Sequence, residues 1–170
     1  MSLKKYVRDI QGFPKEGILF KDITPLLIDP KARKECLEIL LTTLKDKKID
    51  KVIGVESRGF FFGMLLADAL NAGFVPVRKP NKLPYETISA SYDLEYGTDS
   101  LEIHTDAIQK GERILIHDDV LATGGTAEAV CELVEKLGGE IVQLNFIMEL
   151  TFLNGRDKIK GYDVFAAMEY

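Results

Sequence analysis

The stretch that follows the apolar run 113–117 combines acidic, small and hydroxyl side chains in an order that suits a sugar phosphate. Two adjacent carboxylates, Asp118 and Asp119, come first, and a loop of threonine and glycine follows. The amides of such a loop, with a helix N-terminus behind them, can surround a phosphate. The carboxylates would repel that phosphate unless they serve sugar hydroxyls or a magnesium ion. The sequence therefore predicts a ribose 5-phosphate site formed by Asp118, Asp119, Ala122, Thr123, Gly124, Gly125 and Thr126.

The same stretch has a simpler interpretation, in which Gly124 and Gly125 only form a turn and the acidic pair is a solvated strand end. We favour the phosphate site because a whole nine-residue string, and not a lone glycine pair, follows a β-branched strand. The Walker lysine motif and the G-x-G-x-x-G pattern do not occur in the sequence. The P-loop and dinucleotide-binding interpretations therefore lose their main support.

These residues need a scaffold, and the hydrophobic pattern predicts one of alternating strands and helices. Short β-branched runs indicate buried strands, and apolar residues at helical spacing indicate the helices between them. An α/β fold with a central, mostly parallel sheet flanked by helices follows from this order. We expect strands at 51–55, 74–77, 113–117, 140–149 and 163–167, and helices at 30–47, at 59–70 and after 126. Residues 153–160 predict a weaker helix or a turn.

Residues 80–111 break this rhythm, because they are polar and turn-prone and hold only one short alternating run, 101–104. A stretch of this length outside a regular pattern is more often functional than idle. Residues 82–105 lack the apolar periodicity that would attach them to a core. We therefore expect this region to open readily in the free protein.

Length and composition limit the class of protein. The 170 residues show no repeat or linker, which predicts a single domain over residues 1–170. The net charge of −5 argues against a general nucleic-acid binder. The longest apolar stretch, 60–67, is far short of the roughly 20 residues that a membrane span needs. Charges near the start argue against a signal peptide, and Cys36 and Cys131 do not suggest a disulfide framework, so we expect a cytoplasmic protein.

The string 118–126 resembles the diphosphoribosyl-binding signature of the type I phosphoribosyltransferases. Other pieces keep that family's order and spacing, and they resemble its adenine-specific members; these pieces are residues 13–25, 56–60, 78–84 and 92–97. Two positions depart from the pattern: His117 stands where the family often has an aliphatic residue, and Lys21 where arginine is frequent. Neither departure removes a group that the chemistry needs. The resemblance implies the type I phosphoribosyltransferase fold, with a mobile hood at about residues 80–108.

The resemblance also implies where a leaving diphosphate would bind. Glu56, Ser57 and Arg58 match a diphosphate-binding loop that often has a cis peptide, here between Glu56 and Ser57. A plain turn with Ser57 as helix N-cap is the alternative. Arg58 could hold either the diphosphate or the base. A group of basic residues follows the next strand and consists of Arg78, Lys79 and Lys82. Cations there would stabilise the charge that builds up on the leaving diphosphate. The alternative is that these residues are only a solvated strand end.

For the base, the resemblance implies that Phe20 stacks on a purine while the main chain near Leu19 reads its exocyclic amino group. Val120 would close the opposite face. Core packing is the default alternative for these side chains. Glu95 matches the general acid–base for the purine ring nitrogen, placed on a hood that excludes water, although a lone loop glutamate is usually only a solvated charge.

The two histidines, His104 and His117, lie apart from each other and from both cysteines in sequence. A zinc site is therefore not expected. We expect His117 to be a histidine with its hydrogen bonds satisfied, near the edge of the sheet.

The resemblance implies an enzyme that transfers the 5-phosphoribosyl group from 5-phosphoribosyl 1-diphosphate to N9 of adenine. The products would be AMP and diphosphate, with Mg²⁺ bound mainly through the substrate diphosphate and water, and the enzyme would be a homodimer. The residues alone reach only a phosphoribosyl-binding α/β protein. A transferase for hypoxanthine, guanine or xanthine remains open. A non-catalytic sensor of phosphoribosyl diphosphate is a further alternative, although such a regulator would need a basic DNA-binding module for which 170 residues leave no room.

Overall fold

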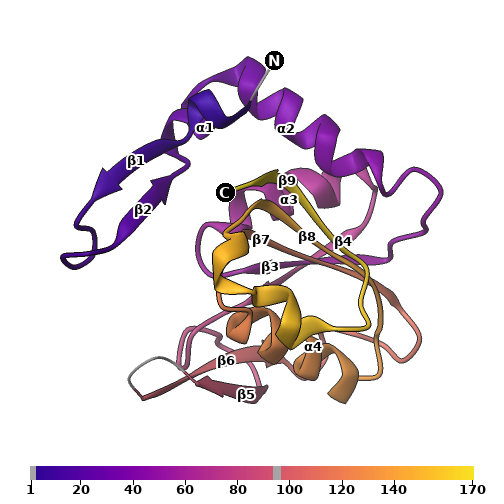
Figure 1. The fold of residues 1–170 in the computed structure, drawn as a ribbon. Coiled ribbons are helices and arrows are strands. Elements are labelled where there is room, and N and C mark those ends of the chain that lie inside the picture. Colours follow the sequence, from indigo (N-terminus) through magenta and orange to yellow (C-terminus); the bar gives the residue numbers. More distant parts are fainter. Residues whose placement is uncertain (1–2, 94–96) are drawn as a thin grey trace.

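The computed structural model describes residues 3–93 and 97–170, and its centre is a five-stranded sheet (Figure 1). All neighbouring strands of this sheet run parallel. This arrangement confirms the predicted α/β fold. Across the sheet the order is β4 (Gly73–Val77), β3 (Lys51–Val55), β7 (Arg113–Leu121), β8 (Glu140–Glu149) and β9 (Val164–Glu169).

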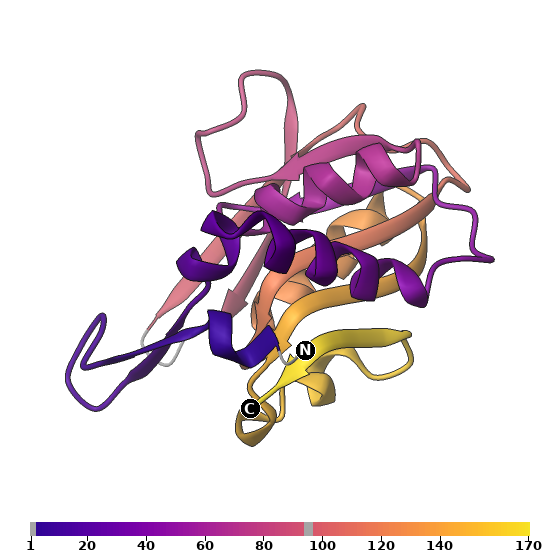
Figure 2. The ribbon, with the colours of Figure 1, turned by 90° about the horizontal axis from the view of Figure 1, so that it is seen from above.

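Helices cover both faces of the sheet (Figure 2). On one face, α2 (Pro30–Thr42) and α3 (Gly59–Ala69) bury an apolar cluster that includes Phe62. On the other face, α4 (Gly125–Lys136) buries a second cluster that includes Val130. Burial on both faces explains why the central strands read as nearly continuous apolar runs.

Helix α2 starts where the sequence predicts and ends earlier. Its N-terminus is capped by Asp29, whose side chain accepts hydrogen bonds from two amides of the first turn. The predicted end at Lys47 is wrong, because the helix ends at Thr42. The physical reason is that residues 45–48 are all charged, so the apolar stripe that holds the helix on the sheet stops at Leu44.

The remaining helical elements are short. The weak helix predicted at 153–160 is present as two 3₁₀ turns. Within the described ranges, no helix is both long enough and apolar enough to cross a membrane. These short elements are η1 (Leu3–Tyr6), α1 (Thr24–Ile28), η2 (Thr151–Leu153) and η3 (Gly155–Ile159).

Residues 8–22 form a hairpin that the sequence did not predict, and we call it the first hairpin. Its strands β1 (Arg8–Gln11) and β2 (Leu19–Asp22) are antiparallel and pair only with each other. It extends away from the sheet (Figure 1). Strands of four residues with one exposed face give little alternation to detect.

Residues 87–104 form the second hairpin, described over 87–93 and 97–104, in place of the expected irregular region. Its strands are β5 (Thr87–Asp93) and β6 (Thr98–His104). The expectation that this region lacks contacts with the core is wrong, because Ala90, Leu101 and Ile103 are buried in the cluster under α4. Alternate residues of each strand face the core, and the small or polar residues between them hide that pattern in the sequence.

Strand β7 is longer than predicted. It continues to Leu121, so Asp118 and Asp119 lie within the strand and not past its end. Its last residues remain in the sheet because the ten-residue strand β8 pairs with them, Val120 with Met148 and Leu121 with Glu149. The carboxylates are therefore held by a central strand of the sheet.

Candidate active site

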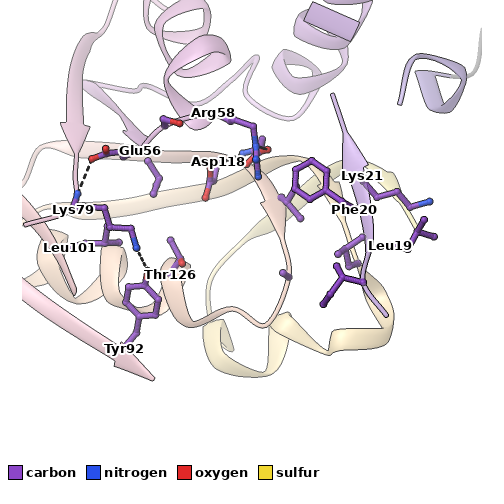
Figure 3. A pocket seen from close by; sticks show the side chains of 17 residues that line it. Leu19, Phe20, Lys21, Glu56, Arg58, Lys79, Tyr92, Leu101, Asp118 and Thr126 are labelled. Atoms are coloured by element: carbon purple, nitrogen blue, oxygen red, sulfur yellow. Dashed lines mark hydrogen bonds and ion pairs between the residues drawn. The ribbon is translucent and has the colours of Figure 1, made fainter. Parts of the chain in front are cut away.

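A cavity of about 490 Å³ lies at the carboxyl ends of β3 and β7, between residues of both hairpins (Figure 3). An adjoining cavity of about 70 Å³ adds Thr123 and Gly124. In open α/β sheets, this edge is where ligands bind. The structure thus brings together most of the predicted site residues, and the larger cavity is lined by Leu19, Phe20, Glu56, Ser57, Arg58, Lys79, Asp118, Asp119, Val120, Ala122 and Thr126.

Three of the predicted site residues that the structure describes do not line either cavity. Gly125 begins α4, and a Cβ added there would lie 3.3 Å from the Tyr92 ring. Arg78 Nη1 donates to the backbone oxygen of Lys82 at 3.3 Å, and neither side chain is part of the cavity wall. Glu95 lies outside the described residues.

The loop that connects β7 to α4 is the stretch for which the sequence predicts a phosphate cradle. Gly124 adopts a left-handed conformation with φ of 86°, and a Cβ there would overlap the carbonyl oxygen of Gly155. Only glycine therefore fits this position. The first amides of α4 have no acceptor within the helix, and the helix dipole makes this end favourable for an anion. Thr126, in the first turn, lines both cavities.

The acidic pair is linked to its surroundings by hydrogen bonds. Asp119 is buried, and its carboxylate accepts a hydrogen bond from the Arg58 guanidinium. The Oδ1 atom of Asp118 accepts a hydrogen bond from the Asp119 amide at 2.8 Å. Burial, together with the neighbouring Asp119 carboxylate, raises the pKa of Asp118 well above its ordinary value. A hydroxyl donor or a cation that reaches Asp118 would favour its charged form.

The loop after β3 has the cis peptide between Glu56 and Ser57 that the resemblance implies. The Glu56 carboxylate accepts hydrogen bonds from the Lys79 amide at 2.9 Å and from Arg78 Nε at 3.1 Å. Burial alone would raise the pKa of Glu56, but these hydrogen bonds lower it below its ordinary value. Glu56 is thus an acceptor that orients the basic residues after β4, since a carboxylate would itself repel diphosphate.

Lys79 points into the cavity with its charge held by the second hairpin. Its ammonium donates to Tyr92 Oη at 2.8 Å and pairs with the Asp99 carboxylate. Tyr92 and Asp99 face each other across β5 and β6. Burial alone would lower the pKa of Lys79, but the hydrogen bonds that it donates to Asp99 and Tyr92 raise the pKa above its ordinary value. Lys79 is therefore a fixed cation at the cavity wall.

Phe20 and Val120 contribute from different elements, β2 and β7, to the apolar part of the cavity. The Arg58 guanidinium carbon lies 5.1 Å from the centroid of the Phe20 ring, and Phe13 packs edge-on against that ring at 5.0 Å. Arg58 therefore connects Asp119 to the aromatic wall. This geometry places Arg58 beside Phe20, the residue that the resemblance implies for the base.

Sequence reasoning missed several cavity residues. Tyr92 lies within the family-like piece 92–97, so the resemblance carried a signal for it. Ile18 and Lys21 lie within the family-like piece 13–25, so the resemblance carried a signal for them as well. The others are brought in by the folding of distant segments. A cation near the start of α4 was missed as well, because Lys158 Nζ lies 3.7 Å from the Cβ position of Gly125. The additional wall residues are Ile18, Lys21, Val55, Tyr92, Leu101 and Leu150.

His117 differs from its expected environment. It lies on β7, the central strand of the sheet and not an edge strand, and it is fully buried. Its Nδ1 atom is 2.7 Å from Asn145 Oδ1, but its Nε2 atom has no hydrogen-bond partner in the described part of the chain. Burial lowers the pKa of His117 to about 4, so the ring is neutral at physiological pH. The expectation of a fully satisfied histidine is therefore wrong.

Comparison with known proteins agrees with this geometry. The family model described as "Phosphoribosyl transferase domain" matches residues 24–165. Adenine phosphoribosyltransferase of Flavobacterium johnsoniae is 76% identical over 170 residues, which cover 100% of both chains. The crystal structure of adenine phosphoribosyltransferase from Rhodothermus marinus is 52% identical, with a TM-score of 0.96 over 99% of this chain and 96% of that chain.

A third similar protein was solved with ligands. It is adenine phosphoribosyltransferase from Saccharomyces cerevisiae, complexed with an imino-altritol bisphosphate and adenine. It is 45% identical, with a TM-score of 0.91 over 96% of this chain and 95% of that chain. The chain therefore belongs to the phosphoribosyltransferase family and, within it, to the adenine phosphoribosyltransferases.

Proposed function

We propose that this chain transfers the 5-phosphoribosyl group from 5-phosphoribosyl 1-diphosphate to N9 of adenine, giving AMP and diphosphate, as a step of purine salvage. The observation that carries the proposal is the composition of one cavity. An anion cradle, a carboxylate pair and an aromatic wall meet there, and they match the phosphate, the ribose and the base of a nucleotide. The adenine bound to the yeast relative supports the choice of base.

In this proposal the cradle fixes one end of the sugar. The 5-phosphate binds to the amides of residues 123–126 at the start of α4, and the Thr126 hydroxyl donates to it. The ribose hydroxyls donate to Asp118 and Asp119, the acceptors that β7 presents at the cavity wall. Holding both ends of the sugar leaves its C1 atom facing the base.

The leaving diphosphate lies toward β3 and β4. The loop amides at Ser57 and the Lys79 ammonium face it across the cavity, and Arg78 and Lys82 extend the positive charge outside the wall. Glu56 orients this group through its hydrogen bonds to Arg78 and Lys79. Cations fixed in this way stabilise the negative charge that develops as the bond breaks.

The reaction exchanges one bond at C1 of the ribose. The C1–oxygen bond breaks, and its electron pair leaves with diphosphate while the N9 lone pair of adenine forms the new C1–N9 bond. The proton on the purine ring must then leave, and we assign it to Glu95 as general base. This assignment rests on the family-like piece 92–97, because Glu95 lies outside the described residues.

Magnesium fits the kind of donors found here. The carboxylate oxygens of Asp118 and Asp119 are hard ligands of the type that Mg²⁺ prefers, and both residues line the cavity. We propose that the ion arrives with the sugar diphosphate, held mainly by the diphosphate and by water. When bound, it neutralises part of the charge on the leaving group.

The proposal extends to the state of the whole protein: one domain over residues 1–170, a homodimer, and a cytoplasmic location. The single sheet between both core clusters supports one domain. Phe61 and Met64 are exposed one turn apart on α3, and a second copy would cover such apolar surface. The free thiols of Cys36 and Cys131 are those of a reducing compartment. Sedimentation at micromolar concentration tests the dimer.

The experiment that tests the function compares adenine, hypoxanthine and guanine as substrates, each with and without Mg²⁺. A site built around an exocyclic amino group leaves polar atoms unpaired when hypoxanthine binds, and such discrimination can reach about 10⁴-fold. We expect AMP formation that depends on Mg²⁺ and a strong preference for adenine. Equal efficiency with hypoxanthine or guanine would assign the chain to another purine substrate, and no turnover with any base would contradict the proposal.

A matched pair of variants tests the cradle. Thr126→Val removes one hydroxyl at the cavity with little change in volume, and we expect the affinity for 5-phosphoribosyl 1-diphosphate to fall about 10- to 100-fold, the range for a hydrogen bond to a charged group. Thr42→Val, whose hydroxyl donates to the Ile39 carbonyl in α2, is the control. Unchanged affinity in a folded Thr126→Val variant would remove Thr126 from the cradle.

A further inference from the structure

The first hairpin supplies residues to the cavity although it has no core of its own. None of residues 8–22 is buried, and its two strands form a separate sheet. It nevertheless contributes Ile18, Leu19, Phe20 and Lys21 to the cavity wall. Contacts outside the apolar core must therefore set the angle at which it meets the sheet.

One such contact is made by Tyr170, which follows β9. The Lys21 ammonium lies over the Tyr170 ring, 4.2 Å from its centroid, and Lys4 of η1 lies over the same ring at 4.8 Å. Lys21 is only 13% exposed in its side chain and also pairs with Asp9 at 2.7 Å. A cation enclosed between a ring and a carboxylate has few alternative positions, so the contact orients the strand that carries it.

Tyr170 is itself fixed to the main sheet. Its amide donates to the Glu149 oxygen at 2.9 Å. Its backbone oxygen accepts hydrogen bonds from the Thr151 amide at 2.9 Å and the Thr151 hydroxyl at 2.7 Å. The neighbouring residue Leu150 lines the cavity. The ring is thus a rigid point at the end of β8, next to the site.

The ring, and not the hydroxyl, makes this attachment. Tyr170 Oη is buried, yet it has no hydrogen-bond partner among residues 3–93 and 97–170. A buried tyrosine hydroxyl usually has a hydrogen-bond partner, but this one has none within those ranges. Replacing Tyr170 with phenylalanine would therefore break no hydrogen bond that the structure describes. The two lysines over the ring, in contrast, depend on its π face.

We propose that Tyr170 is a positioning residue for the base, because its ring holds Lys21 and thereby sets the first hairpin, with Phe20, over the cavity. The inference rests on the proposed transfer to adenine. A second cation–ring contact attaches the hairpin with the roles exchanged: the cation, Arg58, belongs to the main body, and the ring, Phe20, belongs to the hairpin. The hairpin is therefore fixed at two successive residues, Phe20 and Lys21.

The test compares Tyr170→Leu with Tyr170→Phe. Tyr170→Leu removes the π face, and we expect the KM for adenine to rise about tenfold. The KM for 5-phosphoribosyl 1-diphosphate and kcat should stay within about twofold, since the sugar site is built on β7 and α4. Tyr170→Phe should behave as wild type. The matched control is Phe152→Leu, an aromatic side chain nearby that is 69% exposed and lines neither cavity of the site.

Lys21→Met provides a second route if Tyr170→Leu does not fold. Alone it should raise the KM for adenine, and in the double variant with Tyr170→Leu the two effects should not multiply, because they remove the same contact. Multiplicative effects would overturn the proposal. It would also be overturned if Tyr170→Phe were as impaired as Tyr170→Leu, or if both KM values rose equally.

Hydrogen exchange separates this inference from the proposed function. In Tyr170→Leu without substrate, the amides of β2 should exchange faster than in wild type, while those of β7 and β8 are unchanged. That result would support the attachment even if wild type proved inactive with adenine. Unchanged exchange in β2 would overturn the attachment even if wild type proved active.

Discussion

The two hairpins both line the cavity, but they are attached to the molecule in different ways. The first has no buried residue, and ring contacts of Phe20 and Tyr170 hold it. The second buries Leu101 and Ile103 in the core, and Glu102 exchanges backbone hydrogen bonds with Arg78 at 3.0 and 2.7 Å. The second hairpin is therefore part of the core, whereas the first is held at its margin.

From this difference we expect that apolar burial, and not polar composition, decides which part of the site opens. The cost of local opening rises with the apolar contacts that must be broken. We therefore expect the first hairpin to open at low cost and admit the base. The second hairpin should stay packed against the core along β5 and β6 and hold Lys79 in place. A mobile hood over all of residues 80–108 does not fit the burial of Leu101 and Ile103.

The largest effect should come from replacing Glu95, the proposed general base, whose position in the sequence is between β5 and β6, with its amide. Glu95→Gln should lower kcat about 10²- to 10⁴-fold, the usual contribution of a general acid–base, with little change in substrate affinity. Phe20→Leu on the first hairpin should instead raise the KM for adenine and change kcat little. Steady-state kinetics of both variants measure this division. Full turnover in Glu95→Gln would show that Glu95 is not the group that accepts the purine proton.

The next test compares one isoleucine from each hairpin. Ile103→Ala in β6 removes fully buried methyl groups, and we expect it to lower the free energy of unfolding by about 2–5 kcal/mol. Ile18→Ala in the first hairpin, 38% exposed, should change the free energy of unfolding by less than about 1 kcal/mol. Urea unfolding measures both. Equal losses would mean that the hairpins are attached alike.

Acid should loosen the five-stranded sheet, whose central strand β7 carries His117 and against which the second hairpin packs. The folded state lowers the pKa of His117 to about 4, so stability falls as pH decreases from about 6.5 toward that value. The loss from this residue between pH 8 and pH 5 is about 2 kcal/mol.

His117→Val should remove this dependence of stability on pH. At pH 8 the variant also leaves the Oδ1 atom of Asn145 without its hydrogen bond, at a cost of about 1–3 kcal/mol. The control is His104→Val, at the other histidine of the chain, which should keep the dependence of stability on pH. The free energy of unfolding, measured for each variant at pH 8 and pH 5, tests this. If His117→Val lost as much stability between the two pH values as wild type does, His117 would be excluded as the cause.

The smallest effects should come from the ion pairs. Asp99→Asn in the second hairpin and Asp9→Asn in the first each break a partly exposed pair, with Lys79 and Lys21 respectively. We expect each to change the free energy of unfolding by less than about 1 kcal/mol. Thermal unfolding of the two variants measures this. A loss above 2 kcal/mol from Asp99→Asn would mean that charge, and not burial, attaches the second hairpin.

The sequence predicted the elements whose stability is local or apolar. Strands 51–55 and 140–149 have the predicted bounds, because β-branched runs buried on both faces give a strong signal. Both hairpins were missed, since antiparallel pairs of short, half-exposed strands depend on tertiary contacts. The extension of β7 through Asp118 and Asp119 was missed for the same reason, because the partner strand β8 determines it.

The site divides in a similar way. The sequence could place the cradle string and the acidic pair together at one site because these residues are contiguous in sequence. The Lys79–Tyr92–Asp99 group was missed, because it exists only when Tyr92 and Asp99 pair across the second hairpin. Tyr170 gave no signal at all, since its partner Lys21 lies 149 residues earlier in the chain.

The most direct test is a structure of the protein with bound AMP. We expect the 5-phosphate on the amides of residues 123–126 at the start of α4, the ribose hydroxyls on Asp118 and Asp119, and the adenine ring between Phe20 and Val120. A phosphate bound instead at Arg78 and Lys82, or a base that does not touch the first hairpin, would contradict this expectation.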